Sequence, residues 1–163
     1  MAQNSYLRDN AQERERLRAI VARLNDDDLR RSIGHGWTVS AALAHLAYWD
    51  RLVVGWLADW ERLGIRTAPQ LSVWRESLHL EDNNDEMLPQ WLAMPGDAVV
   101  RDVLHTAETL DQRLEALDPA FFQTICATLI SRVGNRPWLI DRATHRREHL
   151  DEIERLLGES ALS

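Results

Sequence analysis

The chain has 163 residues, of which 45% are hydrophobic and 28% charged, and its formal net charge is −7. This length and composition predict a single globular domain over residues 1–163. The negative charge argues against nucleic acid or an anionic membrane as the main partner, because both require a basic surface. All 19 basic residues are arginine, which excludes Schiff-base or nucleophilic lysine chemistry.

The first part of the chain predicts two amphipathic helices. Apolar side chains at spacings of three and four residues predict a first helix over residues 6–24, which ends at the turn-like NDDD sequence. A break follows at RSIGHGW, and the hydroxyl of Thr38 can cap a second helix over residues 39–62. On this helix His45 falls in the same narrow arc as several apolar residues, among them Trp49. We therefore expect His45 in the buried stripe.

A long connection separates the second helix from the third. Residues 64–95 contain prolines at 69 and 89 and the polar sequence EDNNDE, which predicts short helical pieces. A connection of this length is unusual unless it crosses over the domain or covers a site. Asp97 can then cap a third helix, whose apolar residues continue at helical spacing to Pro119.

The last part of the chain predicts one irregular segment and a final helix. The sequence DPAFFQTICATLISRVGNRP has a β-leaning centre, which predicts a short extended pair or another irregular crossover. The last helix is expected to begin near Pro137 and to continue to about Leu157, before Gly158. Four long helices with long connections on either side of the third predict an all-α fold, a four-helix bundle with crossover connections.

The last predicted helix carries two histidines four residues apart, in the sequence ATHRREHLDE. His145 and His149 therefore project to the same side and can converge on one ion at the distance of about 2 Å that zinc requires. The motif is short, and a pair of this spacing arises by chance in about one such chain in five. Two polar residues that share a solvent-facing side are the alternative interpretation.

The position of His45 favours a metal site. A lone imidazole buried among tryptophan and leucine costs free energy unless its ring nitrogens find partners. A metal shared with His145 and His149 would satisfy it from two facing helices, as in other helix bundles. Alternatively, His45 donates to a backbone carbonyl or a buried water while the other two histidines face solvent.

Three segments of the chain resemble a known superfamily. GWTVSAALAHLAYWDR, the connection that contains Asn84, and ATHRREHLDEIERLL are similar, in order and spacing, to the DinB/YfiT-like superfamily of small bacterial four-helix proteins. In that superfamily one histidine on the second helix and an HxxxH pair on the last bind a divalent metal, commonly zinc or nickel. The resemblance implies that His45, His145 and His149 are the metal ligands here.

The remaining histidines and the cysteine favour structural interpretations. His35, His79 and His105 are expected to be structural or solvent-exposed, and Cys126 is expected to be a small buried hydrophobic residue rather than a reactive thiol. A single cysteine, no apolar signal region and no run of about 18 apolar residues predict a soluble cytoplasmic protein.

Charged neighbours of the histidine pair could orient a ligand or bind a substrate. On a helical projection Glu148 points away from the site, and Asp141 is marginal as a group that orients an imidazole. Arg142 and Arg146 project into the apolar arc. We expect them to pair with carboxylates from neighbouring helices, although they could instead bind an anionic substrate group.

A three-histidine site suggests several activities. Three nitrogen ligands leave coordination positions open, and a bound ion could activate water for hydrolysis or hold a thiol as thiolate. The resemblance favours a metal-dependent transferase that activates a low-molecular-weight thiol, of the mycothiol or bacillithiol type, for attack on a small electrophile. A metal-dependent hydrolase and a non-catalytic small-molecule-binding stress-response protein are the alternatives.

Several features of the site and of the assembly follow from the same patterns. Trp49 and Trp138 are candidates for the walls of the site, and the sequence assigns no general base. Family analogy and the tryptophan-rich second helix predict a homodimer.

Overall fold

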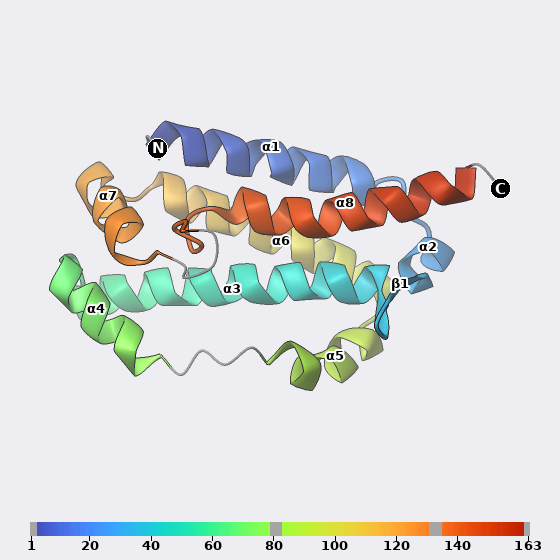
Figure 1. The fold of residues 1–163 in the computed structure, drawn as a ribbon, viewed down its shortest axis with the longest axis horizontal. Helices are drawn as coiled ribbons and strands as arrows, with labels where there is room; N and C mark the ends of the chain where they lie inside the picture. Colours follow the sequence, from blue (N-terminus) through green and yellow to red (C-terminus); the bar gives the residue numbers. More distant parts are fainter. Residues whose placement is uncertain (1–2, 79–82, 131–134, 162–163) are drawn as a thin grey trace.

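The fold is built mainly from helices (Figure 1). A computed structural model describes residues 3–78, 83–130 and 135–161. Of these residues 79% are helical, which confirms the predicted all-α class. The long helices are α1 (Gln3–Val21), α3 (Val39–Leu63), α6 (Gly96–Glu115) and α8 (Arg142–Ala161). The shorter elements are α2 (Asp26–Arg30), β1 (Ser32–Gly34), β2 (Trp37–Thr38), α4 (Ala68–Ser77), α5 (Asn84–Ala93) and α7 (Pro119–Thr128).

The four long helices form a bundle (Figure 1). Helix α3 packs against α6 and α8, and α1 packs against the same two helices. Helices α1 and α8 run in one direction and α3 and α6 in the other, with α4 at one end of the bundle and α5 at the opposite end. The chain from α3 to α6 therefore crosses the length of the bundle, and the predicted crossover is confirmed. No helix in the described part of the chain is both long and apolar enough to span a membrane.

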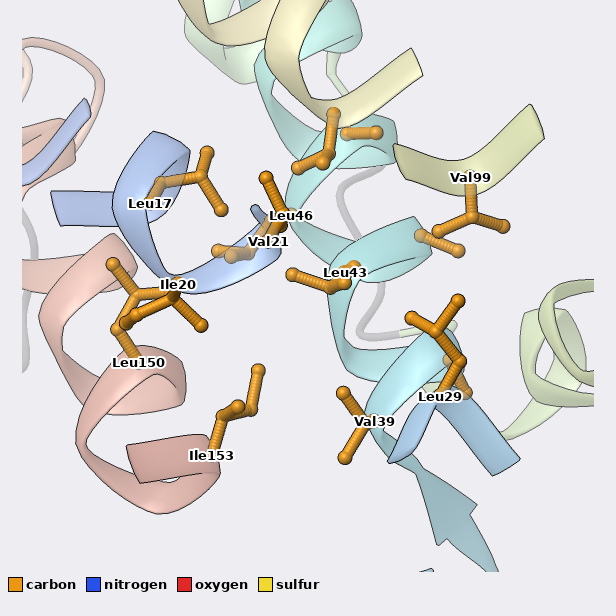
Figure 2. Close-up of a cluster of buried hydrophobic side chains, with 14 of the residues drawn as sticks. Leu17, Ile20, Val21, Leu29, Val39, Leu43, Leu46, Val99, Leu150 and Ile153 are labelled. Atoms are coloured by element: carbon orange, nitrogen blue, oxygen red, sulfur yellow. The ribbon is translucent and has the colours of Figure 1, made fainter. Parts of the chain in front are cut away.

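Two apolar clusters make up the core. In the first, side chains from α1, α3 and α8 point toward one another, among them Leu17, Leu43 and Leu150 (Figure 2). The second cluster lies farther along α3 and includes Trp60 and Phe122, both almost fully buried. Burying each large apolar side chain contributes about 1.5–3 kcal/mol. Amphipathic helices with weak intrinsic stability are thereby held in the bundle.

A buried set of polar residues separates the two clusters. On α3 the first cluster ends at Ala47 and the second begins at Val53, with buried Asp50 between them. Arg146 on α8 donates to Asp111 on α6 at 2.9 and 3.0 Å and to Asp50 at 3.1 Å. The polar layer is defined here as five buried residues: Asn10, Asp50, Asp111, Arg142 and Arg146.

The two arginines of the polar layer form the carboxylate pairs that the sequence predicted. The Nε atom of Arg142 donates to Asp50 at 2.9 Å, so both arginines pair with carboxylates from neighbouring helices. Asn10 on α1 completes the layer, because its side chain accepts from the backbone N–H of Ala143 and donates to the carbonyl of Ile140, each at 2.8 Å. These contacts hold the first turn of α8 against α1.

The segment predicted as a short extended pair or an irregular crossover is instead helical over Pro119–Thr128. Asp118 accepts a hydrogen bond from a backbone N–H of the first turn of α7, and Pro119 stands where a proline is tolerated. Phe122 and Ile125 then lie on one buried face, three residues apart. Burial of this face outweighs the β preference of the side chains, so the prediction was wrong. The end of the segment, residues 131–134, lies outside the described residues.

The bounds of two helices also differ from the predictions. Helix α8 begins at Arg142 rather than near Pro137, because Asp141 caps it by accepting from the backbone N–H of Thr144 at 3.1 Å. It continues past Gly158, since a glycine inside a helix costs only about 1 kcal/mol relative to alanine. Helix α1 covers Gln3–Val21 rather than residues 6–24.

The sequence break at RSIGHGW forms the β1–β2 hairpin. Its turn has positive φ angles at Gly34 (103°), His35 (52°) and Gly36 (81°), a backbone region that favours glycine. The hairpin leads directly into Thr38, whose side chain accepts from the N–H of Ala41 at 3.1 Å and caps α3 as predicted.

Candidate metal centre

The structure brings His45, His145 and His149 together from two helices. His45 lies on α3, and the other two lie one turn apart on α8. One ring nitrogen from each lies within 4.8 Å of the others, and the Nε2 atoms of His45 and His145 are 3.0 Å apart. Two nitrogens that are each about 2.1 Å from a tetrahedral ion lie about 3.4 Å from one another. The spacing therefore fits a shared ion with small side-chain adjustments.

Burial keeps the three imidazoles neutral. It lowers the pKa of His45 to about 3 and the pKa of His149 to about 4. Burial, together with the nearby Arg142 guanidinium, holds the pKa of His145 well below its usual value. Neutral imidazole is the form that binds a metal, so burial holds the three rings in the charge state that a ligand needs. The donor set of three neutral nitrogens thus fits a divalent cation such as zinc or nickel.

His45 is enclosed by aromatic rings. Its ring centroid lies 5.4 Å from that of Trp37 and 5.2 Å from that of Trp91, both edge to face. The Nδ1 atom is buried and makes no hydrogen bond of normal geometry within the described residues. The side chain of Asn84 interacts with the imidazole and partly offsets the lowering of the His45 pKa. His45 is therefore fixed in position by packing, with its Nε2 atom facing His145.

Arg142 connects the cluster to the polar layer. Its Nη2 atom donates to Nδ1 of His145 at 2.9 Å, while its Nε atom donates to Asp50. Because Nδ1 of His145 accepts a hydrogen bond, the hydrogen of the neutral ring lies on Nε2, which faces Nε2 of His45. A metal-ligating histidine usually donates from its second nitrogen to an acceptor. Arg142 places a cationic donor at that position instead.

A cavity of about 600 Å³ opens at the histidine cluster. Trp49 and Trp138 line it, as predicted, and Trp37 from the β1–β2 hairpin adds a third aromatic side chain. The indole N–H of Trp49 donates to the side-chain oxygen of Asn84 on α5 at 3.3 Å. The long connection between α3 and α6 therefore contributes to the site, as its length suggested.

Two acidic residues also line the cavity. The projection that placed Glu148 away from the site was wrong, because Glu148 and Glu152 both contribute to the cavity surface. They follow His145 and His149 by three residues each, and residues three apart are neighbours on a helix surface. This spacing was a usable signal for both residues. Asp141 does not orient an imidazole; it caps α8 and accepts from the Thr144 hydroxyl at 2.7 Å.

The other histidines and Cys126 lie largely as expected. His105 is exposed on α6, and His79 lies outside the described residues. His35 is exposed in the hairpin turn, although it also borders the cavity. Cys126 packs at the edge of the second apolar cluster, where burial raises the pKa of its thiol. A raised pKa disfavours the reactive thiolate, in agreement with a packing role.

The geometry defines a class of protein: a four-helix bundle with three convergent histidines beside an open pocket. The chain belongs to the family described as the mycothiol maleylpyruvate isomerase N-terminal domain, which it matches over residues 10–145. This is a DinB/YfiT-like helical domain family, so the resemblance inferred from the sequence is confirmed. The matched region contains His45 and His145, and His149 follows four residues later. Comparisons with curated proteins and with solved structures give no match.

Proposed function

We propose that the protein is a metal-dependent transferase. In this proposal His45, His145 and His149 hold a divalent cation, zinc or nickel, and a low-molecular-weight thiol of the mycothiol or bacillithiol type attacks a small electrophile. The observation that carries the proposal is the convergence of three neutral imidazoles at the floor of a pocket of about 600 Å³. Structural metal sites are usually closed by four protein ligands, whereas three ligands leave room for a reactant.

Different residues of the site would bind the ion and position the reactants. A bound divalent cation would supply a positive charge that lowers the pKa of a neighbouring thiol or water. His45 is fixed on α3 by Trp37 and Trp91, so the site is organised before a ligand enters. The tryptophans of the pocket provide apolar walls that exclude water from part of a bound reactant.

The family favours a thiol over water as the nucleophile. Its description names mycothiol, which is a thiol, and the chain matches that family over most of its length. Hydrolysis would need a residue that takes a proton from water. Glu148 and Glu152 line the pocket and could take that role, so the family description, and not the geometry, favours the transferase.

The first experiment measures metal content by mass spectrometry after reconstitution of untagged protein. Wild type is compared with His45→Ala and His149→Ala, and His105→Ala is the matched control because it removes an exposed histidine. We expect near-stoichiometric metal in wild type and in the control, and its loss in the two site variants. Absence of metal from reconstituted wild type would overturn the proposal.

The second experiment tests the reaction on the metal-loaded protein. Thiols and a panel of electrophiles are incubated with it, and conjugates are identified by mass spectrometry. Conjugation that requires both the thiol and the three histidines supports the transferase. Cleavage of a substrate without thiol would point to the hydrolase, and thiol binding without any conjugate to the non-catalytic binding protein.

The predicted homodimer stays a prediction. The described residues leave Leu63 and Val73 more than half exposed, at 55% and 68%, near the end of α3 and on α4. Sedimentation equilibrium at micromolar concentration tests the assembly directly, and a monomeric mass would contradict the homodimer.

A further inference from the structure

The pocket beside the histidine cluster has an acidic wall. Glu148 and Glu152 extend the face of α8 that carries His145 and His149, so four chemically active side chains follow one another along a single stripe. Among the described residues that line the pocket, none is an arginine. The protein contains no lysine at all, so arginine is its only permanently cationic side chain.

The two glutamates are not equivalent. An oxygen of Glu148 lies 3.9 Å from the guanidinium of Arg136, which offsets part of its charge, and its side chain is 61% exposed. Glu152 is half-buried and forms no ion pair with any described residue. The negative charge of Glu152 is therefore the one that a ligand in the pocket would meet.

The aromatic side chains of the pocket also favour a cationic ligand. Trp37, Trp49 and Trp138 line the pocket, and the faces of indole rings attract cations. A carboxylate attracts a cationic group and repels an anionic one, most strongly where protein walls displace water. Aromatic and acidic side chains together are a surface suited to an amine.

We propose that Glu152 favours a cationic amine on the substrate or co-substrate over an anionic group at the same place, and that it does so against the positive charge of the histidine-bound ion. The inference rests on the proposed function, because it concerns the ligand whose thiol reaches the histidine-bound ion. Glu152 follows His149 by three residues, which is a rise of about 4.5 Å along the helix. A thiol and an amine separated by about two carbon atoms span that distance.

Three small thiols test the proposal, because each carries a group of different charge two carbon atoms away from its sulfur. They are cysteamine, which is cationic, 2-mercaptoethanol, which is neutral, and 3-mercaptopropionate, which is anionic. Their binding to the cobalt(II)-reconstituted protein is followed by the thiolate-to-cobalt absorption band in wild type, Glu152→Gln and Glu108→Gln. Glu108 is exposed on α6 and does not line the pocket, so its variant removes the same charge elsewhere.

The expected result is a change in preference rather than a general loss of affinity. Glu152→Gln weakens cysteamine about threefold, strengthens 3-mercaptopropionate about threefold and leaves 2-mercaptoethanol unchanged, because a partly exposed charge pair contributes modestly. Each thiol is compared with itself across variants, so differences in thiol acidity cancel. Glu108→Gln leaves all three affinities unchanged.

The outcomes separate this inference from the proposed function. If all three thiols bind and Glu152→Gln alters them equally or not at all, the charge preference is wrong while the thiol site stands. If cobalt is bound but no thiol changes its spectrum, both proposals are overturned. Should Glu152→Gln fail to fold, Glu148→Gln replaces it, with changes in the same directions of about 1.5-fold because Arg136 offsets that charge; unchanged affinities there would overturn the preference.

Discussion

The polar layer and the histidine cluster are adjacent on α3 and α8, and they bring side chains together in different ways. The layer pairs opposite charges, as when Arg146 contacts Asp50 and Asp111. The cluster brings together three groups of the same kind, all neutral and close enough to share one ion. Groups of opposite charge satisfy each other, whereas identical ligand groups that converge need a bound partner, such as an ion, to satisfy them.

Arg142 belongs to both regions and shows how they are related. It is 3% exposed, it pairs with Asp50, and it donates to His145. The layer therefore fixes the first turn of α8, which carries His145, and His149 follows one turn later. Stability and ligand binding should be separable by mutation, because each region contains residues that do not contact the other.

The largest expected effect comes from breaking the polar layer. Asp50→Ala removes the carboxylate shared by Arg142 and Arg146. Arg146 keeps Asp111, but the buried Arg142 loses its carboxylate partner, and an unpaired buried cation costs about 3–5 kcal/mol. Urea unfolding measures this cost. Asp102→Ala is the matched control, because its partner Arg51 is exposed, and it should cost at most about 1 kcal/mol. Equal losses in both variants would contradict a structural role for the layer.

The second effect belongs to the histidine cluster. A ligand that binds only the folded protein at 100 times its dissociation constant stabilises it by about 2.7 kcal/mol. Added zinc or nickel should therefore raise the unfolding free energy of wild type and not that of His45→Ala. Without metal, the unfolding free energies of wild type and His45→Ala should be close. Their difference should be much smaller than the difference between wild type and Asp50→Ala. Stabilisation of His45→Ala by the metal would show that the ion binds elsewhere.

A third prediction concerns the residue that links the regions. Arg142→Gln removes a positive charge next to the site and offers His145 an acceptor, which is the usual partner of a ligating histidine. We expect metal affinity to rise about tenfold, as measured by competition with a chelator. Arg147→Gln, on the exposed side of the same helix, is the control. Weaker binding in Arg142→Gln would mean that the guanidinium supports the ligand rather than opposing the ion.

The smallest effect is expected at a histidine that belongs to neither region. His105 is exposed on α6, so His105→Ala should change the unfolding free energy by less than about 0.5 kcal/mol. Its metal stoichiometry should equal that of wild type. Thermal unfolding with and without metal checks both points, and a loss of bound metal would extend the site beyond the three convergent histidines.

Much of the fold was predictable because helical periodicity is a local property. The apolar spacing of α3 and the capping group of Thr38 are both present in the sequence, and the structure has both. Residues 119–128 were mispredicted because their side chains favour strands, and only burial of Phe122 and Ile125 against the bundle makes a helix favourable. Local preference is a weak guide where packing decides.

The candidate site, like the fold, was predictable only in part from the sequence. The HxxxH spacing of His145 and His149 and the place of His45 on an apolar stripe follow from helix geometry, so the sequence by itself determined which residues could converge. The contribution of Trp37 and the partners of Arg142 and Arg146 depend on how segments about 100 residues apart pack together. Only the tertiary structure decided these, because the free energy of a contact depends on distance in space and not on position along the chain.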